Sequence, residues 1–437
     1  MNLIDKFCLL ALSGTEYGAL EKSLQSLKKT EFLSREELNQ ISRTKLRRLL
    51  ETAQKQTVYW NETLSSFKET GLFEGEVNEI LGILPILTKA IIRQQGEAIW
   101  NSGLTEYIKA TTGGTTGQPL AIRRDLPCHY ITKAALWRGR LSWGLRPSSR
   151  EVFLTSFGKI SILGNLKMRL GNKRLGDAFP GTDEDVKKVL HLLRSFKPVG
   201  LEGFASGLLE SVKRTKEKSD IRIPVLVSTG EMLYHHQREQ LEAFYSAKVY
   251  TYYGSNEVGS IAYECEMQKL HVCEEHVVVE TLNELGESVI NEQGKVVVTD
   301  LDNIAMPFIR YELGDIATLS NKPCGCGRKS LVIEELQGRT QDYLSSPSGA
   351  RLQATQLAAY LKDLIHIGQI QFVQTAEKQI QLKFTGDQNS AKKEIQFIKQ
   401  HLANRLGNEV ECIEINLKEI EKTQRGKVPL ILRKLQS

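Results

Sequence analysis

A segment rich in glycine and threonine, "ATTGGTTGQPL" (residues 110–120), contains the residue types that hold phosphate groups. Glycines allow successive backbone N–H groups to point at one anion, and threonine hydroxyls add further donors. An ordinary P-loop closes with Gly-Lys-Ser/Thr, but this segment contains no lysine. We therefore predict a phosphate loop of another kind over residues 111–119, formed by Thr111, Thr112, Gly113, Gly114, Thr115, Thr116 and Gly117.

Cysteine and histidine residues form a second group with possible chemistry. Cys265, His271 and Cys273 lie within nine residues, and Cys324 and Cys326 follow about fifty residues later. Thiolates and imidazole in this number suit a tetrahedral zinc ion. We predict a structural site made by Cys265, His271, Cys324 and Cys326, with Cys273 as a reserve ligand. The alternative is a set of reduced cysteines that line the core.

Five further motifs follow the glycine–threonine loop: "STGEML" (228–233), "TYYGSNEVG" (251–259), "YELGD" (311–315), "GRTQD" (338–342) and "KTQRGKVPL" (422–430). Together the six motifs, in this order over about 320 residues, resemble the adenylate-forming enzymes. This superfamily includes acyl-CoA synthetases, peptide-synthetase adenylation domains and luciferases. The segments "LPILTK", "DLDNIAMPFIRYELGD" and "CGCGR" resemble its phenylacetate–CoA ligase branch, including the capsule-biosynthesis type of adenylating protein.

The resemblance implies a role for each motif. The loop would hold the β and γ phosphates of ATP, and Glu257 would bind Mg²⁺, which prefers oxygen ligands. Lys427 would neutralise charge between the carboxylate and the α-phosphate, with Asp342 as the hinge between domains. The remaining predicted contacts to the nucleotide are Gly230 and Glu231 along the adenine edge, Tyr253 and Gly254 beside the base, Asp315 on the ribose, and Arg339 near the ribose.

Each of these polar residues also has a structural alternative. Glu257 could pair with a nearby base, and Asp315 could cap a turn. Lys427 could be a surface lysine of a basic tail, since Arg425, Arg433 and Lys434 lie nearby. The shared order of six motifs favours the functional interpretation in all three cases.

The expected activity is that of an ATP-dependent carboxylate-activating ligase. An acyl-AMP would form with release of pyrophosphate, and the resemblance favours an aryl or arylacetic acid and coenzyme A as the acceptor. The chain has "LSSPSGARLQATQL" (344–357) after the hinge, where phenylacetate–CoA ligases usually carry a glycine-containing stretch. An amine, a hydroxyl or a carrier-protein thiol therefore stays open as the acceptor.

The elements that must position these motifs can be expected from hydrophobic periodicity. Residues 1 to about 85 are expected to form a helical leader, with a capping box at Ser34 and Glu37. Strands alternating with helices predict an α/β core over about 100–340 with a largely parallel sheet. We place the end of the large domain at 340 and predict a small, mobile α+β domain over 341–437, with strands near 369–374, 379–384 and 411–417 and a helix at about 390–407.

Composition excludes some classes of protein. The chain has 437 residues, 41% of them hydrophobic and 25% charged, and its net charge of +6 is spread thinly. No segment has the ~20 apolar residues that span a bilayer, and no signal peptide is evident, so we expect a cytoplasmic protein. The sequence does not predict the oligomeric state. A nucleic-acid-binding or scaffold protein on a degenerate nucleotide fold is the alternative from another class. The missing P-loop lysine disfavours a kinase or ATPase.

Overall fold

The computed structural model describes residues 2–67, 74–111, 120–155, 161–178, 180, 182–215, 220–339, 343–354, 357, 361, 364–420 and 428–435. Residue contacts divide the chain into two compact units. Unit 1 comprises Met1–Ser149, Ser161–Lys173 and Tyr250–Leu336, and unit 2 comprises Arg150–Ile160, Arg174–Val249 and Gln337–Ser437. The predicted loop beyond Thr111, the hinge residue Asp342 and Lys427 lie outside the described residues.

Unit 1 begins with helices, as the sequence predicts. They are α1 (Leu3–Ser13), α2 (Tyr17–Thr30), α3 (Arg35–Gln56), α4 (Val58–Ser65), α5 (Val77–Ile83) and α6 (Lys89–Gln95). Helix α3 starts at the predicted capping box, in which the Ser34 N–H donates to Glu37 Oε2 at 2.8 Å and the Glu37 N–H donates to Ser34 Oγ at 3.2 Å. Its residues Leu46, Leu49 and Leu50 are fully buried and so fix the face of α3 that packs inward.

Long-range contacts attach these helices to the rest of unit 1. Arg35 pairs with Glu274, and Lys45 Nζ lies 2.8 Å from Asp302 Oδ1. Trp60, also fully buried, donates its indole N–H to the carbonyl of Pro307 at 3.1 Å. The helical leader is therefore built into the same hydrophobic core as residues about 250 positions later.

The sheet of unit 1 is antiparallel in all of its described pairings, so the expectation of a largely parallel sheet is wrong for this part. Its strand order is β10-β11-β12-β13-β9-β8-β7. Turns and loops rather than crossover helices connect consecutive strands here, and short connections produce antiparallel neighbours. The bounds are β7 (Lys248–Ser255), β8 (Gly259–Glu264), β9 (Leu270–Val272), β10 (Val277–Leu282), β11 (Gln293–Asp300), β12 (Tyr311–Ser320) and β13 (Val332–Arg339).

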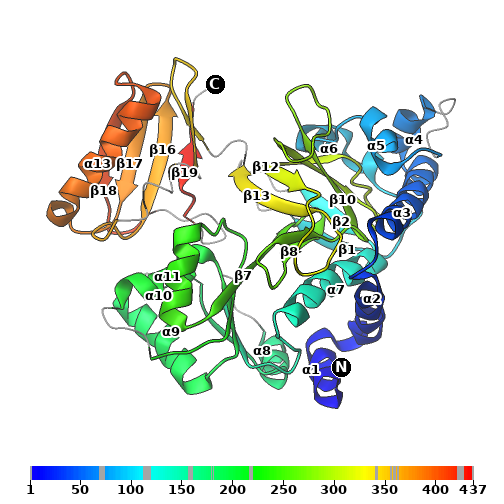
Figure 1. The fold of residues 1–437 in the computed structure, drawn as a ribbon, viewed down its shortest axis with the longest axis horizontal. Coiled ribbons are helices and arrows are strands. Elements are labelled where there is room, and N and C mark those ends of the chain that lie inside the picture. Colours follow the sequence, from blue (N-terminus) through cyan, green and yellow to red (C-terminus); the bar gives the residue numbers. More distant parts are fainter. Residues whose placement is uncertain are drawn as a thin grey trace. The chain divides into compact units, whose positions relative to one another are not determined.

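Three further segments complete unit 1. Strands β1 (Ile108–Thr111) and β2 (Ala121–Arg124) pair as a separate antiparallel ribbon on either side of the predicted phosphate loop. Helix α7 (Leu126–Ser142) follows with Asp125 as its N-cap. Helix α8 (Ile162–Leu170) is short and contains no buried residue. Figure 1 shows α7 beside α2, which agrees with their contacts.

Unit 2 contains the parallel strands that the sequence predicts. Strands β5 and β3 are parallel, as are β5 and β6, in the order β6-β5-β3-β4. Helix α10 connects β5 to β6, the usual crossover between parallel neighbours. The bounds are β3 (Glu151–Thr155), β4 (Lys173–Asp177), α9 (Asp183–Phe196), β5 (Gly200–Gly203), α10 (Ala205–Arg214), β6 (Val225–Ser228) and α11 (His235–Tyr245).

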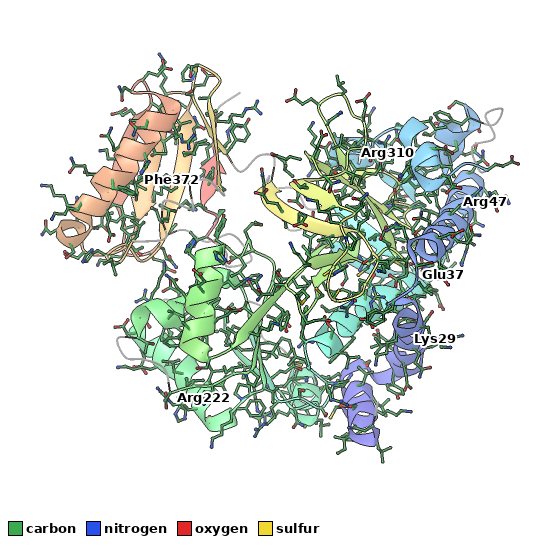
Figure 2. All side chains as sticks on the ribbon, in the orientation of Figure 1. Lys29, Glu37, Arg47, Arg222, Arg310 and Phe372 are labelled. Carbon is green, nitrogen blue, oxygen red and sulfur yellow. The ribbon has the colours of Figure 1, made fainter. Side chains whose placement is uncertain are left out.

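The C-terminal part of unit 2 is an α+β structure with its own hydrophobic core. Helix α13 covers one face of a four-stranded sheet of order β18-β17-β16-β19 (Figure 1). Phe372 of β16, labelled in Figure 2, is fully buried in this core with the predicted helix residues Ile395 and Ile398. The bounds are β14 (Tyr343–Ser345), β15 (Arg351–Gln353), β16 (Ile370–Ala376), β17 (Gln379–Phe384), α13 (Gln388–Leu406), β18 (Glu411–Asn416) and β19 (Ile431–Arg433).

Candidate active site and metal centre

The turn between β7 and β8 in unit 1 holds Glu257, and two glycines fix its shape. A Cβ atom on Gly254 would lie 2.3 Å from the carbonyl oxygen of Gly259, so only glycine allows this close approach of the backbone. Gly259 has a φ of 91°, and its backbone packs against Thr132. Both glycines of the "YGSNEVG" motif therefore have a structural reason to be there.

The Glu257 carboxylate is buried and has two neighbours that the sequence does not predict. Tyr311 donates its hydroxyl to Glu257 Oε1 at 3.1 Å, and Lys89 Nζ lies 3.2 Å from the same oxygen. Lys89 is the first residue of α6, after Thr88 as N-cap. Lys89 belongs to the segment "LPILTK" and Tyr311 to the motif "YELGD", but only the fold shows that both contact Glu257.

The entry to the predicted phosphate loop lies beside the same turn. Asn256 donates its side-chain amide to the carbonyl of Thr111 at 3.2 Å. Arg124, which follows the loop in sequence, donates to the carbonyls of Asn256 and Glu257 at 3.1 and 3.2 Å. Both ends of the loop are therefore tied to the Glu257 turn, although the loop itself, from Thr112 to Pro119, lies outside the described residues.

Tyr253 and Asp315 are in direct contact. The hydroxyl of Tyr253 donates to Asp315 Oδ2 at 2.5 Å, across the strands β7 and β12. Gly314, which precedes Asp315, has a φ of 81° and so sets the backbone turn of "YELGD" within the strand. The residues predicted beside the base and the ribose are therefore neighbours in unit 1.

Glu231 lies in unit 2 and binds a helix end. Its Oε2 accepts from the backbone N–H of Ser206, in the first turn of α10, at 2.9 Å. Gly230 has a φ of 69°, a left-handed conformation that favours glycine. Arg339 is the last residue of β13, and its side chain lies outside what the structure describes.

The four preferred cysteine and histidine residues do come together in unit 1. The sulfur and nitrogen atoms of Cys265, His271, Cys324 and Cys326 all lie within 4.8 Å of one another. Cys265 Sγ and Cys324 Sγ are 3.8 Å apart, which is about the edge of a tetrahedron with Zn–S bonds of about 2.3 Å. Cys273, the predicted reserve ligand, is buried but is not part of this group.

The surroundings favour ligation by a neutral imidazole. His271 places Nε2 3.3 Å from Cys326 Sγ and Nδ1 3.0 Å from Ser330 Oγ, so its second nitrogen has an orienting partner. Burial, with a smaller contribution from Arg328, lowers the pKa of His271 to about 4. Burial also raises the pKa of Cys265 to about 12, which a zinc ion would reverse because it binds thiolate.

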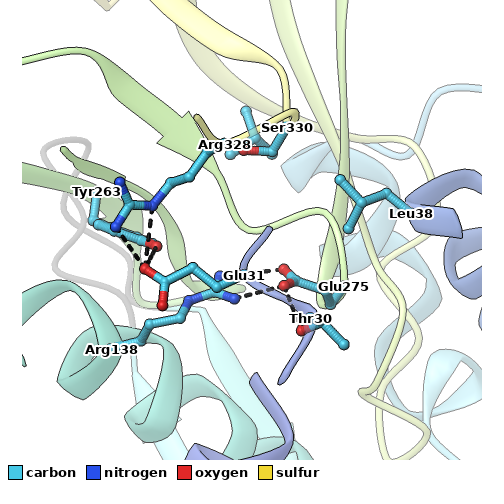
Figure 3. A pocket seen from close by; sticks show the side chains of 9 residues that line it. Thr30, Glu31, Leu38, Arg138, Tyr263, Glu275, Arg328 and Ser330 are labelled. Atoms are coloured by element: carbon cyan, nitrogen blue, oxygen red, sulfur yellow. Dashed lines mark hydrogen bonds and ion pairs between the residues drawn. The ribbon is translucent and has the colours of Figure 1, made fainter. Parts of the chain in front are cut away.

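A small pocket next to this group is filled by paired charges (Figure 3). Arg138 and Glu275 are buried and pair at 2.5 Å, and Thr30 Oγ1 donates to the same carboxylate at 2.7 Å. Arg328 pairs with Glu31 across the pocket. None of the residues predicted to contact ATP lines it. The residues around the pocket therefore connect the N-terminal helices to the neighbourhood of the cysteine and histidine group.

Comparison with known proteins gives three similarities. Residues 344–434 match the family model of the CapK C-terminal domain. Over 263 residues the chain is 27% identical to phenylacetate–coenzyme A ligase of Thermus thermophilus, covering 57% of this chain and 58% of that protein. It is 23% identical over 273 residues to protein CapK of Staphylococcus aureus, covering 60% of each. The matches thus span less than two thirds of either relative.

The fold agrees with these similarities. A crystal structure of 2-hydroxyisobutyryl-CoA ligase in its postadenylation state superposes with a TM-score of 0.73, at 16% identity, covering 93% of this chain and 91% of that one. The chain therefore has the fold of this acyl-CoA ligase, and the predicted α/β fold with a C-terminal α+β domain is confirmed. Its sequence similarity lies with the branch that includes phenylacetate–coenzyme A ligase and CapK.

Proposed function

We propose that the protein is an ATP-dependent ligase that activates a carboxylic acid as an acyl-adenylate, releases pyrophosphate and transfers the acyl group to coenzyme A. One observation carries this proposal. Residues from separate motifs gather in unit 1, where the turn that holds Glu257 is bonded to Thr111 and Tyr253 contacts Asp315. The relatives named above are ligases of this class or CapK proteins.

The roles of the residues follow from their chemistry. A carboxylate oxygen of the acid would attack the α-phosphorus of ATP, and pyrophosphate would leave with the bonding electrons. Such transfers depend on positioning and electrostatics. The loop 111–119 would hold the departing phosphates, and Lys89 would add positive charge beside Glu257. Lys427 would steady the attacking carboxylate, and a thiol of coenzyme A would then displace AMP.

Two metal ions belong to the proposal. Glu257 would hold Mg²⁺, which supplies charge neutralisation at the phosphates, because carboxylate oxygens are the ligands that this hard cation prefers. The ion would compete with the Lys89 ammonium, which lies 3.2 Å from Glu257 Oε1. Cys265, His271, Cys324 and Cys326 would hold a structural Zn²⁺, because three sulfurs and one nitrogen complete a tetrahedron. Four protein ligands leave no open position, so this ion would have no part in the reaction.

The finer assignments rest on the branch of the family. An aryl or arylacetic acid is the proposed substrate, and a cytoplasmic location fits ATP, coenzyme A and reduced cysteines. Within the described residues, no helix has both the length and the apolar character needed to cross a bilayer. A biosynthetic ligase that passes the acyl group to an amine, a hydroxyl or a carrier-protein thiol is the second candidate, favoured by the segment 344–357.

The test of adenylation is ATP–pyrophosphate exchange with a panel of aryl, arylacetic, fatty and amino acids. We expect exchange only with one class of acid, and a fall of about 10²–10³-fold in Lys427→Ala, because a charge that acts mainly in the transition state is removed. Lys418→Ala, at an exposed lysine of the same domain, is the matched control and should exchange like the wild type.

One result would contradict this proposal, and a second would contradict only the role of Lys427. Exchange with no acid, combined with nucleic-acid binding that weakens steeply with salt, would favour the binding protein instead. Equal exchange by Lys427→Ala and the wild type would remove the role of Lys427 but leave adenylation in place. Adding coenzyme A, hydroxylamine or a carrier protein to the active mixture then identifies the acceptor from the product.

Asp315→Asn is expected to raise the KM for ATP roughly 10- to 100-fold with a smaller change in kcat. The reason is that a hydrogen bond to a charged acceptor contributes about 1.5–3 kcal/mol. Tyr253→Phe removes the hydroxyl that donates to Asp315 but keeps the ring, so its KM should change less. An unchanged KM in Asp315→Asn would show that Asp315 serves only as the acceptor for Tyr253.

A further inference from the structure

Two helices of unit 1, α1 and α8, expose large apolar side chains that the proposed reaction does not use. Leu3 is 85% exposed and Ile162 is 92% exposed. Eight such residues are each at least 48% exposed. They are Leu3, Ile4, Phe7 and Leu10 on α1 and Ile162, Leu163, Leu166 and Leu170 on α8. We call these eight residues the apolar patch. Exposed apolar surface of this extent marks an interaction site.

The two helices are in contact, so the patch is a local feature of one surface. Cys8 Sγ of α1 lies 3.9 Å from the carbonyl of Leu170, the last residue of α8. A Cβ atom on Gly171 would lie 2.7 Å from the side chain of Leu12, so the end of α8 packs closely on α1. Figure 1 shows α1 and α8 side by side near the N-terminus.

On each helix, apolar residues lie on a face that does not pack against the core of unit 1. On α1, Asp5, Cys8 and Leu9 are buried, and the patch residues lie on the opposite face. On α8 nothing is buried, although Ile162, Leu166 and Leu170 recur at the helical spacing of four residues. The apolar residues of α8 therefore contribute little to the core of unit 1, and a core role does not explain them.

The exposed charged side chains of α1 and α8 have one sign. Lys167 and Arg169 are exposed on α8, which contains no acidic residue, whereas Lys6 of α1 is partly exposed but pairs with Glu21 of α2 at 3.5 Å. The only acidic residue of the two helices is Asp5, whose side chain is 1% exposed. Its carboxylate accepts from Ser148 Oγ at 2.5 Å and pairs with Arg146 at 3.4 Å. A partner therefore meets apolar side chains and positive charge, with no exposed carboxylate from either helix.

We propose that α1 and α8 dock the protein onto the surface of a lipid bilayer that contains anionic lipids. Helices with Leu, Ile and Phe on one face and Lys or Arg beside it lie in the bilayer interface. Anionic headgroups complement Lys167 and Arg169. A second copy of the chain fits less well, because a symmetric contact through the patch would bring like charges together.

The test is flotation of the purified full-length protein with vesicles of phosphatidylcholine, with and without phosphatidylglycerol. We expect binding to the vesicles that contain phosphatidylglycerol, and weaker binding as salt increases. Ile162→Ser combined with Leu166→Ser should reduce the bound fraction at least tenfold. Lys167→Gln combined with Arg169→Gln should remove the preference for anionic vesicles and the salt dependence.

A matched control is Leu285→Ser combined with Ile365→Ser, which changes residues that are 82% and 83% exposed on other parts of the chain. This variant should bind vesicles like the wild type. Circular dichroism melting checks that all variants are folded. The proposal is overturned if the wild type does not float with anionic vesicles, or if the control loses binding as much as the α8 variant. A concentration-dependent dimer that Ile162→Ser with Leu166→Ser dissociates, without vesicle binding, would assign the patch to self-association instead.

Discussion

Replacing Glu257 by glutamine is expected to lower ATP–pyrophosphate exchange by about 10²–10³-fold with little loss of stability. The substitution keeps the size of the side chain and an acceptor oxygen for the hydroxyl of Tyr311, but it removes the negative charge that a divalent cation needs. The exchange rate at saturating acid, measured across a series of Mg²⁺ concentrations, checks the prediction. A rate that higher Mg²⁺ partly restores would assign the loss to metal binding.

The competing interpretation is that Glu257 only pairs with Lys89. In that case Lys89→Met should be as harmful as Glu257→Gln, and both should act through lower thermal stability. Glu292→Gln, at an exposed glutamate of the same unit, serves as the matched control for the change in charge. A stable Glu257→Gln protein with wild-type exchange at every Mg²⁺ concentration would rule out the metal-binding role.

Purified protein is expected to contain one zinc ion, which Cys324→Ser loses. The melting temperature should fall by roughly 5–10 °C, since a structural zinc site contributes directly to folding and a few kcal/mol moves Tm by this amount in a domain of this size. Metal analysis and thermal melting, with and without a chelator, measure both effects. The chelator should lower the Tm of the wild type and leave Cys324→Ser unchanged.

Two cysteine variants make this test specific. Cys273→Ser tests whether the reserve residue is a ligand. We expect this variant to keep its zinc, because Cys273 lies outside the group of four. Cys412→Ser changes a partly buried cysteine of unit 2 and should keep both zinc and Tm. Wild-type protein without zinc would support the alternative of reduced cysteines in the core.

Much of the fold could be predicted because its signals are local. The capping box at Ser34 and Glu37 and the strand near 379–384 depend on neighbouring residues, and both appear where expected. The direction of strand pairing is not a local property. The apolar runs of unit 1 look like buried strands in either direction, and the length of their connections, rather than their composition, makes them antiparallel.

In the candidate site, too, local features could be predicted and long-range contacts could not. The cysteine and histidine residues could be chosen from residue type and spacing, and the structure brings the preferred four together. Lys89 could not be placed beside Glu257, since nothing within either segment indicates that two such distant parts of the chain return to one turn. The hydrogen bond from Tyr253 to Asp315 could not be predicted for the same reason, because the two residues belong to separate motifs.

The contacts of the N-terminal helices have a consequence for how the chain folds during synthesis. Arg35, Lys45 and Trp60 find their partners 239, 257 and 247 residues later in the sequence. The ribosome therefore releases α3 and α4 long before these partners exist, and contacts of such large sequence separation form slowly. Until about residue 307 has emerged, α3 and α4 contact each other but lack these distant partners. We expect the newly made chain to depend on chaperones during this interval, and truncated chains that end before Glu274 to aggregate.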